Sequence, residues 1–222
     1  MTELNTEKFR NCFVGKRALV CLILAAAIGF ATTGSAPGAE TEKPASVAAD
    51  RQLPKAKQTT LSLYLTAAQA YEKWKAAPDK VKLIDVRTPE EYAFVGHPEM
   101  ALNIPYAFVN YQRKNGKTEY GPRLNSEFVA EVKKFTKPGD TLLVMCRSGG
   151  RSAKAVDLLA AAGIKNAYSV IDGVEGDKVT DPDSVFFGKR MKNGWKNTAP
   201  WVYDIDPEKL ILGEGAAKQT AK

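Results

Sequence analysis

The chain has 222 residues, a length suited to one domain with extensions at its ends. Hydrophobic residues make up 44% of it and charged residues 26%, a balance that excludes a wholly disordered or collagen-like protein. The formal net charge is +7, yet the basic residues are scattered rather than clustered, so we expect no nucleic-acid partner.

The first 39 residues follow the pattern of a secretory signal peptide. Four basic residues lie between positions 8 and 17, an uncharged apolar run of 14 residues covers 18–31, and small residues follow to Ala39. As a helix the apolar run would span about 21 Å, short of the roughly 30 Å hydrocarbon core of a membrane. We therefore expect a cleaved signal, a periplasmic or secreted protein, and no stable membrane insertion afterwards. Anchoring by an uncleaved signal is the alternative.

Removal of that signal would leave Cys146 as the only cysteine, because Cys12 and Cys21 lie within residues 1–39. No internal disulfide could then form, even in an oxidising compartment. A lone thiol is either a buried, inert side chain or a nucleophile, and its surroundings in the sequence decide between the two.

Three regions follow the signal. Residues 40–60 are rich in Ala, Pro, Lys and Glu without apolar periodicity, which predicts a flexible linker. Residues 61–203 alternate helix and strand patterns, which predicts an α/β domain with a mainly parallel five-stranded sheet and helices on both faces. Residues 204–222 are expected to form a C-terminal tail.

The predicted elements of the domain begin with a helix. Thr66 and Gln69 form a capping box, and Pro78 ends the helical run. A buried strand of β-branched residues comes next, and then Thr88-Pro89 signals the start of a short helix. In chain order, we predict helices over 67–77, 89–94, 126–135 and 152–162, and strands over 81–86, 102–104, 141–145 and 167–171.

Cys146 follows one of these strands and opens the loop Cys-Arg-Ser-Gly-Gly-Arg-Ser, residues 146–152. The carboxyl ends of strands are where open α/β sheets place their sites. Two adjacent glycines let the backbone curl, so that N–H groups at the start of the next helix form a cradle for an anion. The cradle and the two arginines favour the thiolate, so we interpret Cys146 as a nucleophile.

Four motifs resemble successive landmarks of a rhodanese domain: LIDVRTPEEY (83–92), GHP to LNIPY (96–106), CRSGGRS (146–152) and DG (172–173). The resemblance implies a sulfurtransferase that takes a sulfane sulfur from thiosulfate or a related donor. Cys146 would carry the sulfur as a persulfide and pass it to cyanide or to a small or protein thiol. It also implies that the loop holds the persulfide, with one of its arginines binding the donor's sulfonate. The implied loop residues are Arg147, Ser148, Gly149, Gly150, Arg151 and Ser152.

A cysteine phosphatase or arsenate reductase is the nearest rival chemistry. Its loop places five residues between the cysteine and an arginine, whereas only four separate Cys146 from Arg151. Met145 also stands where phosphatases typically have histidine. Both features favour sulfur transfer.

The remaining polar candidates are given structural roles. His97, the only histidine, belongs to a motif that precedes a strand in rhodanese-like sequences. Asp85 and Arg87 are predicted to form a scaffold ion pair with Glu90 or Glu91. Without a Cys/His cluster or a calcium-binding spacing, we expect no metal and no cofactor.

The chain departs from the family pattern after Gly173. An insertion of about twenty residues, 174–193, precedes Gly194-Trp195. We expect its aromatic residues, Phe186 and Phe187 among them, to pack onto the core. A lid or docking surface is the alternative, and it supports a second functional hypothesis: a non-catalytic persulfide carrier or docking module for a periplasmic partner.

Overall fold

A computed structural model describes residues 53–213 of the chain. The predicted signal peptide and most of the predicted linker therefore lie outside the described residues. Within residues 53–213, no helix combines the length and the apolar character needed to cross a membrane.

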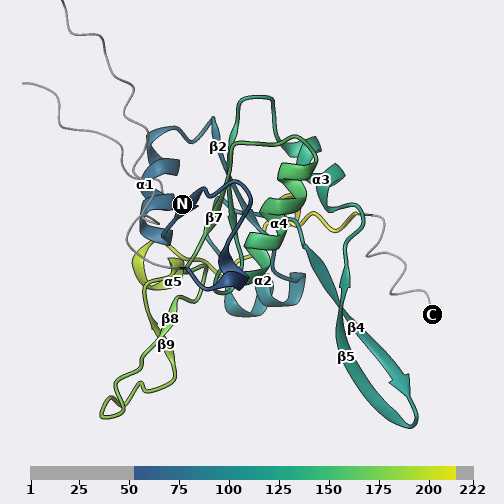
Figure 1. The fold of residues 1–222 in the computed structure, drawn as a ribbon, viewed down its shortest axis with the longest axis vertical. Helices are drawn as coiled ribbons and strands as arrows, with labels where there is room; N and C mark the ends of the chain where they lie inside the picture. The colour runs from purple at the N-terminus through teal and green to yellow at the C-terminus, as the bar shows by residue number, and fades with distance from the viewer. Residues whose placement is uncertain (1–52, 214–222) are drawn as a thin grey trace, which may run out of the picture. The chain divides into compact units, whose positions relative to one another are not determined.

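A five-stranded parallel sheet forms the centre of the fold, as predicted (Figure 1). Its spatial order is β1-β7-β6-β2-β3, which places β6, the strand before Cys146, in the middle. The bounds are β1 (Tyr64–Leu65), β2 (Val81–Asp85), β3 (Leu102–Asn103), β6 (Thr141–Met145) and β7 (Ala167–Val170).

Strand β1 is the one member of the sheet whose position the sequence did not predict. It has only two residues, and Tyr64 and Leu65 pair with Ser169 and Val170 of β7. A two-residue strand is too short to show the alternation by which strands are recognised. It forms because a long-range partner is available.

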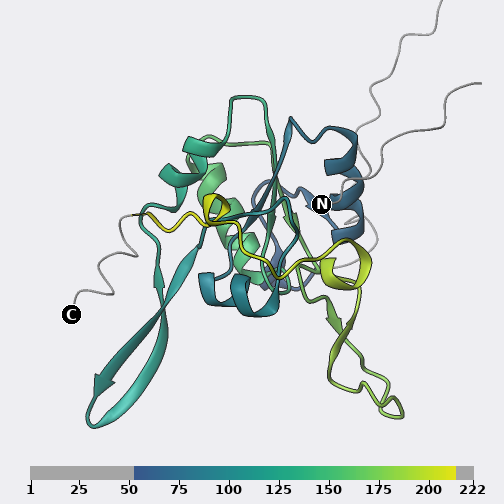
Figure 2. The same ribbon diagram turned by 180° about the vertical axis from the view of Figure 1, so that it is seen from behind.

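Helices cover both faces of the sheet, and each face has its own apolar core (Figures 1 and 2). α1 (Ala67–Ala76) and α5 (Trp195–Thr198) cover one face, and α3 (Phe128–Phe135) and α4 (Gly150–Ala161) cover the other. α2 (Pro89–Val95) follows β2 and contributes Tyr92 to the α1 side.

The capping signals in the sequence are realised at α1 and α2. Thr66 accepts from the backbone N–H of Gln69, and Thr88 accepts from that of Glu91. The Gln69 and Glu91 side chains in turn accept from the cap backbone, so both helices begin with complete capping boxes.

Two antiparallel hairpins follow carboxyl ends of the sheet strands; both project beyond the same end of the fold, and they diverge from each other (Figures 1 and 2). One consists of β4 (Ala107–Lys114) and β5 (Lys117–Leu124) and was not predicted. Its turn is Asn115-Gly116, with φ values of 51° and 76°, which fits a type I′ turn. The other, β8 (Asp177–Lys178) and β9 (Arg190–Lys192), is built by the insertion.

Residues 53–60 differ from the flexible linker expected there, and we call them the N-terminal strap. They include the 3-10 helix η2 (Lys55–Lys57) and lie against α4. Thr60 donates to a carboxylate oxygen of Asp157 on α4 through its N–H at 2.8 Å and its hydroxyl at 2.9 Å. The N–H of Thr59 donates to the Tyr64 hydroxyl at 2.7 Å. Composition suggested a linker because the contacts of Thr60 with Asp157 span 97 positions, and no local pattern in the sequence reports them.

The described part of the predicted C-terminal tail continues along the edge of the sheet. It contains the short 3-10 helix η3 (Pro207–Lys209). Leu210 forms a parallel bridge with Asn103 of β3, and the N–H of Ile211 donates to the Asn103 carbonyl at 2.9 Å. The segment therefore covers the β3 edge.

Candidate active site

Cys146 lies directly after β6, at the carboxyl end of the central strand. Its exposed fraction is only 2%, and it belongs to the core on the α3 and α4 side. The backbone N–H of Gly149 points at the sulfur and donates to Sγ at 3.2 Å. The first turn of α4 begins at Gly150, so the sulfur lies beside a helix N-terminus.

Gly149 and Gly173 allow the loop to close around the sulfur. Gly149 has a φ of 102°, and a Cβ atom there would lie 2.4 Å from the Ile171 carbonyl oxygen. Gly173 has a φ of 62°, and its Cβ would lie 2.3 Å from the Cys146 carbonyl oxygen. Both positions therefore require glycine. The DG motif is in this way part of the active site's support, with Val174 N–H donating to the Cys146 carbonyl at 2.8 Å.

Asp172 fastens this part of the chain to two helices. One carboxylate oxygen accepts from the Ala67 N–H at the start of α1, and the other from the Gly194 N–H before α5, both at 2.8 Å. Burial raises the pKa of Asp172 above its ordinary value, although these backbone donors act in the opposite direction.

Two buried serines lie behind the sulfur. The Ser152 hydroxyl is 3.8 Å from Sγ and donates to the Gly149 carbonyl at 3.0 Å. It also lies 3.1 Å from the hydroxyl of Ser169 on β7. The sequence placed Ser152 in the loop but gave no role to Ser169, whose signal was a polar residue within an otherwise apolar strand.

The Arg151 side chain is paired with Glu91 of α2. Two hydrogen bonds of 2.5 and 2.6 Å join the guanidinium to the carboxylate, and both side chains are about 30% exposed. Burial alone would raise the pKa of Glu91, but the bonds and charge of Arg151 outweigh it and lower that pKa. No local pattern predicts this pairing, which spans 60 positions.

A cavity of about 280 Å³ opens beside Cys146. Arg147, which is exposed, contributes to its wall, so the two loop arginines differ in setting: one is bound to a carboxylate and the other faces solvent. Two contributors lie outside the predicted loop, Lys154 of α4 and Ala56 of the strap. The lining residues are Ala56, Cys146, Arg147, Ser148, Gly150, Arg151 and Lys154.

Asp85 and Arg87 form a fully buried ion pair with each other, which corrects the predicted pairing with Glu90 or Glu91. The closest contact joins Arg87 Nη2 to Asp85 Oδ2 at 2.6 Å, and neither side chain is exposed. Arg87 also donates to the carbonyls of Glu91 and Gly96, at 3.3 and 2.8 Å. The alternating direction of side chains along an extended segment brings residues 85 and 87 to the same side.

His97 occupies a structural position, in agreement with the role given to it. It is 1% exposed and stacks on Tyr92 with 3.6 Å between ring centroids. Its Nδ1 lies 3.2 Å from the Tyr92 carbonyl, and burial lowers its pKa. Its backbone pairs with that of Val202, which fixes the chain after α5.

The insertion does not place its aromatic residues on the core, contrary to expectation. Phe186 and Phe187 are 46% and 58% exposed between β8 and β9. Trp195, just after the insertion, is fully buried and packs edge-on against Tyr71. The exposed aromatics belong to a hairpin that extends from the sheet, whereas Trp195 belongs to the α1-side core.

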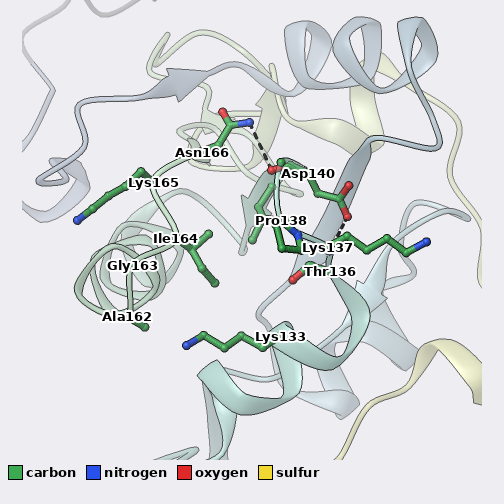
Figure 3. A pocket seen from close by; sticks show the side chains of 12 residues that line it. Lys133, Thr136, Lys137, Pro138, Asp140, Ala162, Gly163, Ile164, Lys165 and Asn166 are labelled. Carbon is green, nitrogen blue, oxygen red and sulfur yellow. Dashed lines mark hydrogen bonds between the residues drawn. The ribbon is translucent and has the colours of Figure 1, made fainter.

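A larger cavity of about 490 Å³ lies at the opposite end of the sheet, between the carboxyl ends of α3 and α4 (Figure 3). Its polar groups close the surrounding turns. Lys165 donates to the Ala160 carbonyl at 2.9 Å, Asp140 accepts from the Lys137 N–H at 2.9 Å, and Asn166 donates to the Asp140 carbonyl at 3.3 Å. Among the described residues, no three Asp, Glu, His or Cys side chains are grouped to hold a metal ion.

The parallel sheet and the loop around Cys146 are those of a rhodanese-like domain. The family's sequence model matches residues 66–178, half of the chain, and the protein belongs to this family. The match includes Cys146 and its loop but excludes the strap and most of the β8–β9 hairpin.

The chain is similar to several curated proteins. It is 40% identical over 105 residues to protein HIGH ARSENIC CONTENT 1, mitochondrial, and over 92 residues to thiosulfate sulfurtransferase 18, both from Arabidopsis thaliana. These alignments cover 44% and 40% of the chain, but only 57% and 61% of the two relatives. The uncharacterised protein RP600 of Rickettsia prowazekii is 31% identical over 123 residues, which are 54% of the chain and 82% of that protein.

Among solved structures, the crystal structure of Rv0390 from M. tuberculosis is similar to this chain. It is 29% identical, with a TM-score of 0.49. The similarity covers 63% of the chain and 96% of Rv0390.

Proposed function

We propose that the protein is a sulfurtransferase that moves a sulfane sulfur from thiosulfate or a related donor to a thiol or to cyanide. The observation that carries this proposal is the Cys146 sulfur held at the carboxyl end of β6 by the Gly149 N–H, beneath a cavity with basic walls. The likeness to a relative named thiosulfate sulfurtransferase supports the same chemistry.

In the proposed first step, the Cys146 thiolate attacks the outer sulfur of thiosulfate. The sulfur–sulfur bond of the donor breaks, and its electron pair leaves on sulfite. In the second step, an acceptor thiolate or cyanide attacks the outer sulfur of the persulfide, and the electron pair of that bond returns to Cys146. The thiolate is regenerated, so the cycle needs no external oxidant or reductant.

The side chains around the sulfur suggest separate tasks within this cycle. Arg147 is exposed at the cavity and is suited to bind the sulfonate of an incoming donor. Arg151 is held by Glu91, so we assign it to shaping the loop and supplying positive charge near the sulfur. The Gly149 N–H is suited to stabilise negative charge on the sulfur.

Incubation with thiosulfate tests the proposal. The protein should gain the mass of one sulfur atom on Cys146 and should form thiocyanate when cyanide is added. Cys146→Ser should abolish both, while Ser184→Ala, a change in the β8–β9 hairpin that does not line the cavity at Cys146, should preserve both. Failure of the wild-type protein to acquire sulfur would refute the proposal.

A persulfide carrier that docks on a partner is the second candidate. It is favoured by Phe186 and Phe187, which are exposed on a hairpin at the active-site end of the sheet (Figure 1). A persulfide that forms on Cys146 but does not turn over with cyanide or small thiols would support the carrier.

We also propose that the protein is exported. The charge and hydropathy pattern of residues 1–39 supports this proposal, and with it a periplasmic or secreted location.

A further inference from the structure

We propose that the N-terminal strap completes the active site, with Ala56 forming one wall of the cavity at Cys146 and Lys57 holding Gly149 in position. The strap precedes residue 66, where the match to the family begins, so it lies outside the matched part of the chain. The inference rests on the proposed function only in treating Cys146 as the reacting group.

Ala56 contributes to the site by forming part of the cavity wall. It lines the same cavity as Cys146 and Arg147 although it is 90 positions away from the cysteine. Its carbonyl oxygen would lie 3.9 Å from a Cβ atom on Gly150, so the strap passes in van der Waals range of the first turn of α4. A donor bound at the sulfur would meet the strap on that side.

Lys57 contacts the part of the loop that binds sulfur. Its amine donates to the Ile171 carbonyl at 2.8 Å. Its Cδ atom would lie 3.1 Å from a Cβ on Gly149, so the aliphatic stem packs against this glycine. Gly149 is thereby enclosed between Ile171 and Lys57, with its N–H directed at Sγ. We assign Lys57 as a positioning residue because it acts on the sulfur through Gly149.

The second anchor of the strap lies away from the sulfur. Thr60 is bound to Asp157 in the third turn of α4 by the two hydrogen bonds described above. Loss of this anchor would loosen the strap without altering Lys57 or the loop. The anchor therefore allows the position of the strap to be tested separately from the charge of Lys57.

The experiment measures how the rate of Cys146 alkylation by iodoacetamide depends on pH. The full chain is used, and modification of the peptide that contains Cys146 is followed by mass spectrometry. Lys57→Met removes the amine that donates to the Ile171 carbonyl but keeps most of the aliphatic stem, and Lys57→Arg retains a donor at that position. Lys55→Met is the matched control, because Lys55 is an exposed lysine of the same 3-10 helix. Asp157→Ala releases the second anchor.

We expect Lys57→Met to move the midpoint of the pH profile upward by about 0.7 unit, the fivefold change that follows from weakening one hydrogen bond to the sulfur. Lys55→Met should leave the midpoint unchanged. Lys57→Arg should keep the midpoint close to the wild-type value. Greater access to the sulfur would raise the plateau rate but would not move the midpoint.

Asp157→Ala separates the position of the strap from its charge. Other charged groups near the sulfur are Arg147, Arg151, Lys154 and Glu91, and these variants leave all four in place. Loss of a carboxylate would by itself move the midpoint downward, whereas a loosened strap should move it upward. A downward or absent shift would overturn the inference, as would a Lys57→Met profile equal to that of Lys55→Met.

Circular dichroism identifies any variant that fails to fold. If Lys57→Met fails to fold, Asp157→Ala decides whether the strap positions the sulfur loop. Alkylation needs no sulfur donor, so the result does not depend on catalysis. If the variants shift the alkylation midpoint as expected but the wild-type protein forms no persulfide, the proposed function is refuted and the role of the strap stands.

Discussion

Glu91 joins two parts of the active-site end, the start of α2 and the sulfur loop, through one carboxylate. It closes the capping box of α2 through the Thr88 N–H, and it binds Arg151 of the sulfur loop with two hydrogen bonds. A change at this residue therefore affects the loop through Arg151. Glutamine could retain the capping bond but not the ion pair.

Glu91→Gln should lower the free energy of unfolding at pH 7 by about 1 kcal/mol, the upper range for partly exposed ion pairs. Arg151 holds the pKa of Glu91 below its unfolded value, so the stabilisation is present above about pH 4.3 and is lost as pH falls through the lower folded value. The difference between wild type and variant should therefore vanish in acid. Chemical denaturation at neutral and acidic pH measures it.

Glu90→Gln is the matched control, since Glu90 is the exposed neighbour of Glu91 in the same helical turn. It should leave stability unchanged at both pH values. Equal effects of the two substitutions, or an effect of Glu91→Gln that persists in acid, would contradict the assigned role of the ion pair.

At the scale of elements, the C-terminal segment acts as a cover for β3. Leu210 packs beside the α1-side core and Ile211 beside the α3-side core, while Lys209 donates to the Glu99 carbonyl at 2.9 Å. An uncovered edge strand presents unpaired backbone groups that can pair with another chain.

A chain that ends at Tyr203 should lose about 2 kcal/mol of unfolding free energy, from the apolar contacts of two partly buried side chains. It should also self-associate more readily. Guanidinium denaturation and size-exclusion chromatography measure the two effects. A chain that ends at Gly213 is the control, and an equal loss in both would argue against the covering role.

Local signals in the sequence were sufficient for most of the elements. The capping boxes at Thr66 and Thr88 gave the starts of two helices, and runs of apolar residues gave four of the five sheet strands. The β4–β5 hairpin was missed although Asn115-Gly116 is a strong turn signal. The sequence alone could have revealed it.

The site could be predicted only where its residues are consecutive. Cys146 and the glycine that binds it lie in one loop, so their spacing was informative. Glu91, Lys57 and Ser169 reach the site through tertiary structure, and no local pattern reports a pairing across tens of residues. The partner of Arg87 was wrongly predicted for a different reason: Asp85 lies only two positions away, and the alternation of side chains along an extended segment was not taken into account.

At the scale of the whole molecule, export can be tested directly. N-terminal sequencing of protein recovered from the extracytoplasmic fraction should show a new terminus near residue 40, and the precursor should accumulate when secretion is blocked. Recovery of an intact N-terminus from the membrane fraction would favour the anchored alternative, and recovery from the cytoplasm would refute export.

The pairing of β1 with β7 governs when this protein can fold. Strand β1 is the first sheet strand to be synthesised, and its partner β7 follows more than 100 residues later. The two strands can pair only after residues 167–170 have been made. The β3 edge waits longer still, until residues 210 and 211 have been made. Distant pairings of this kind slow folding. The central sheet consequently cannot be completed until nearly the whole chain has been synthesised.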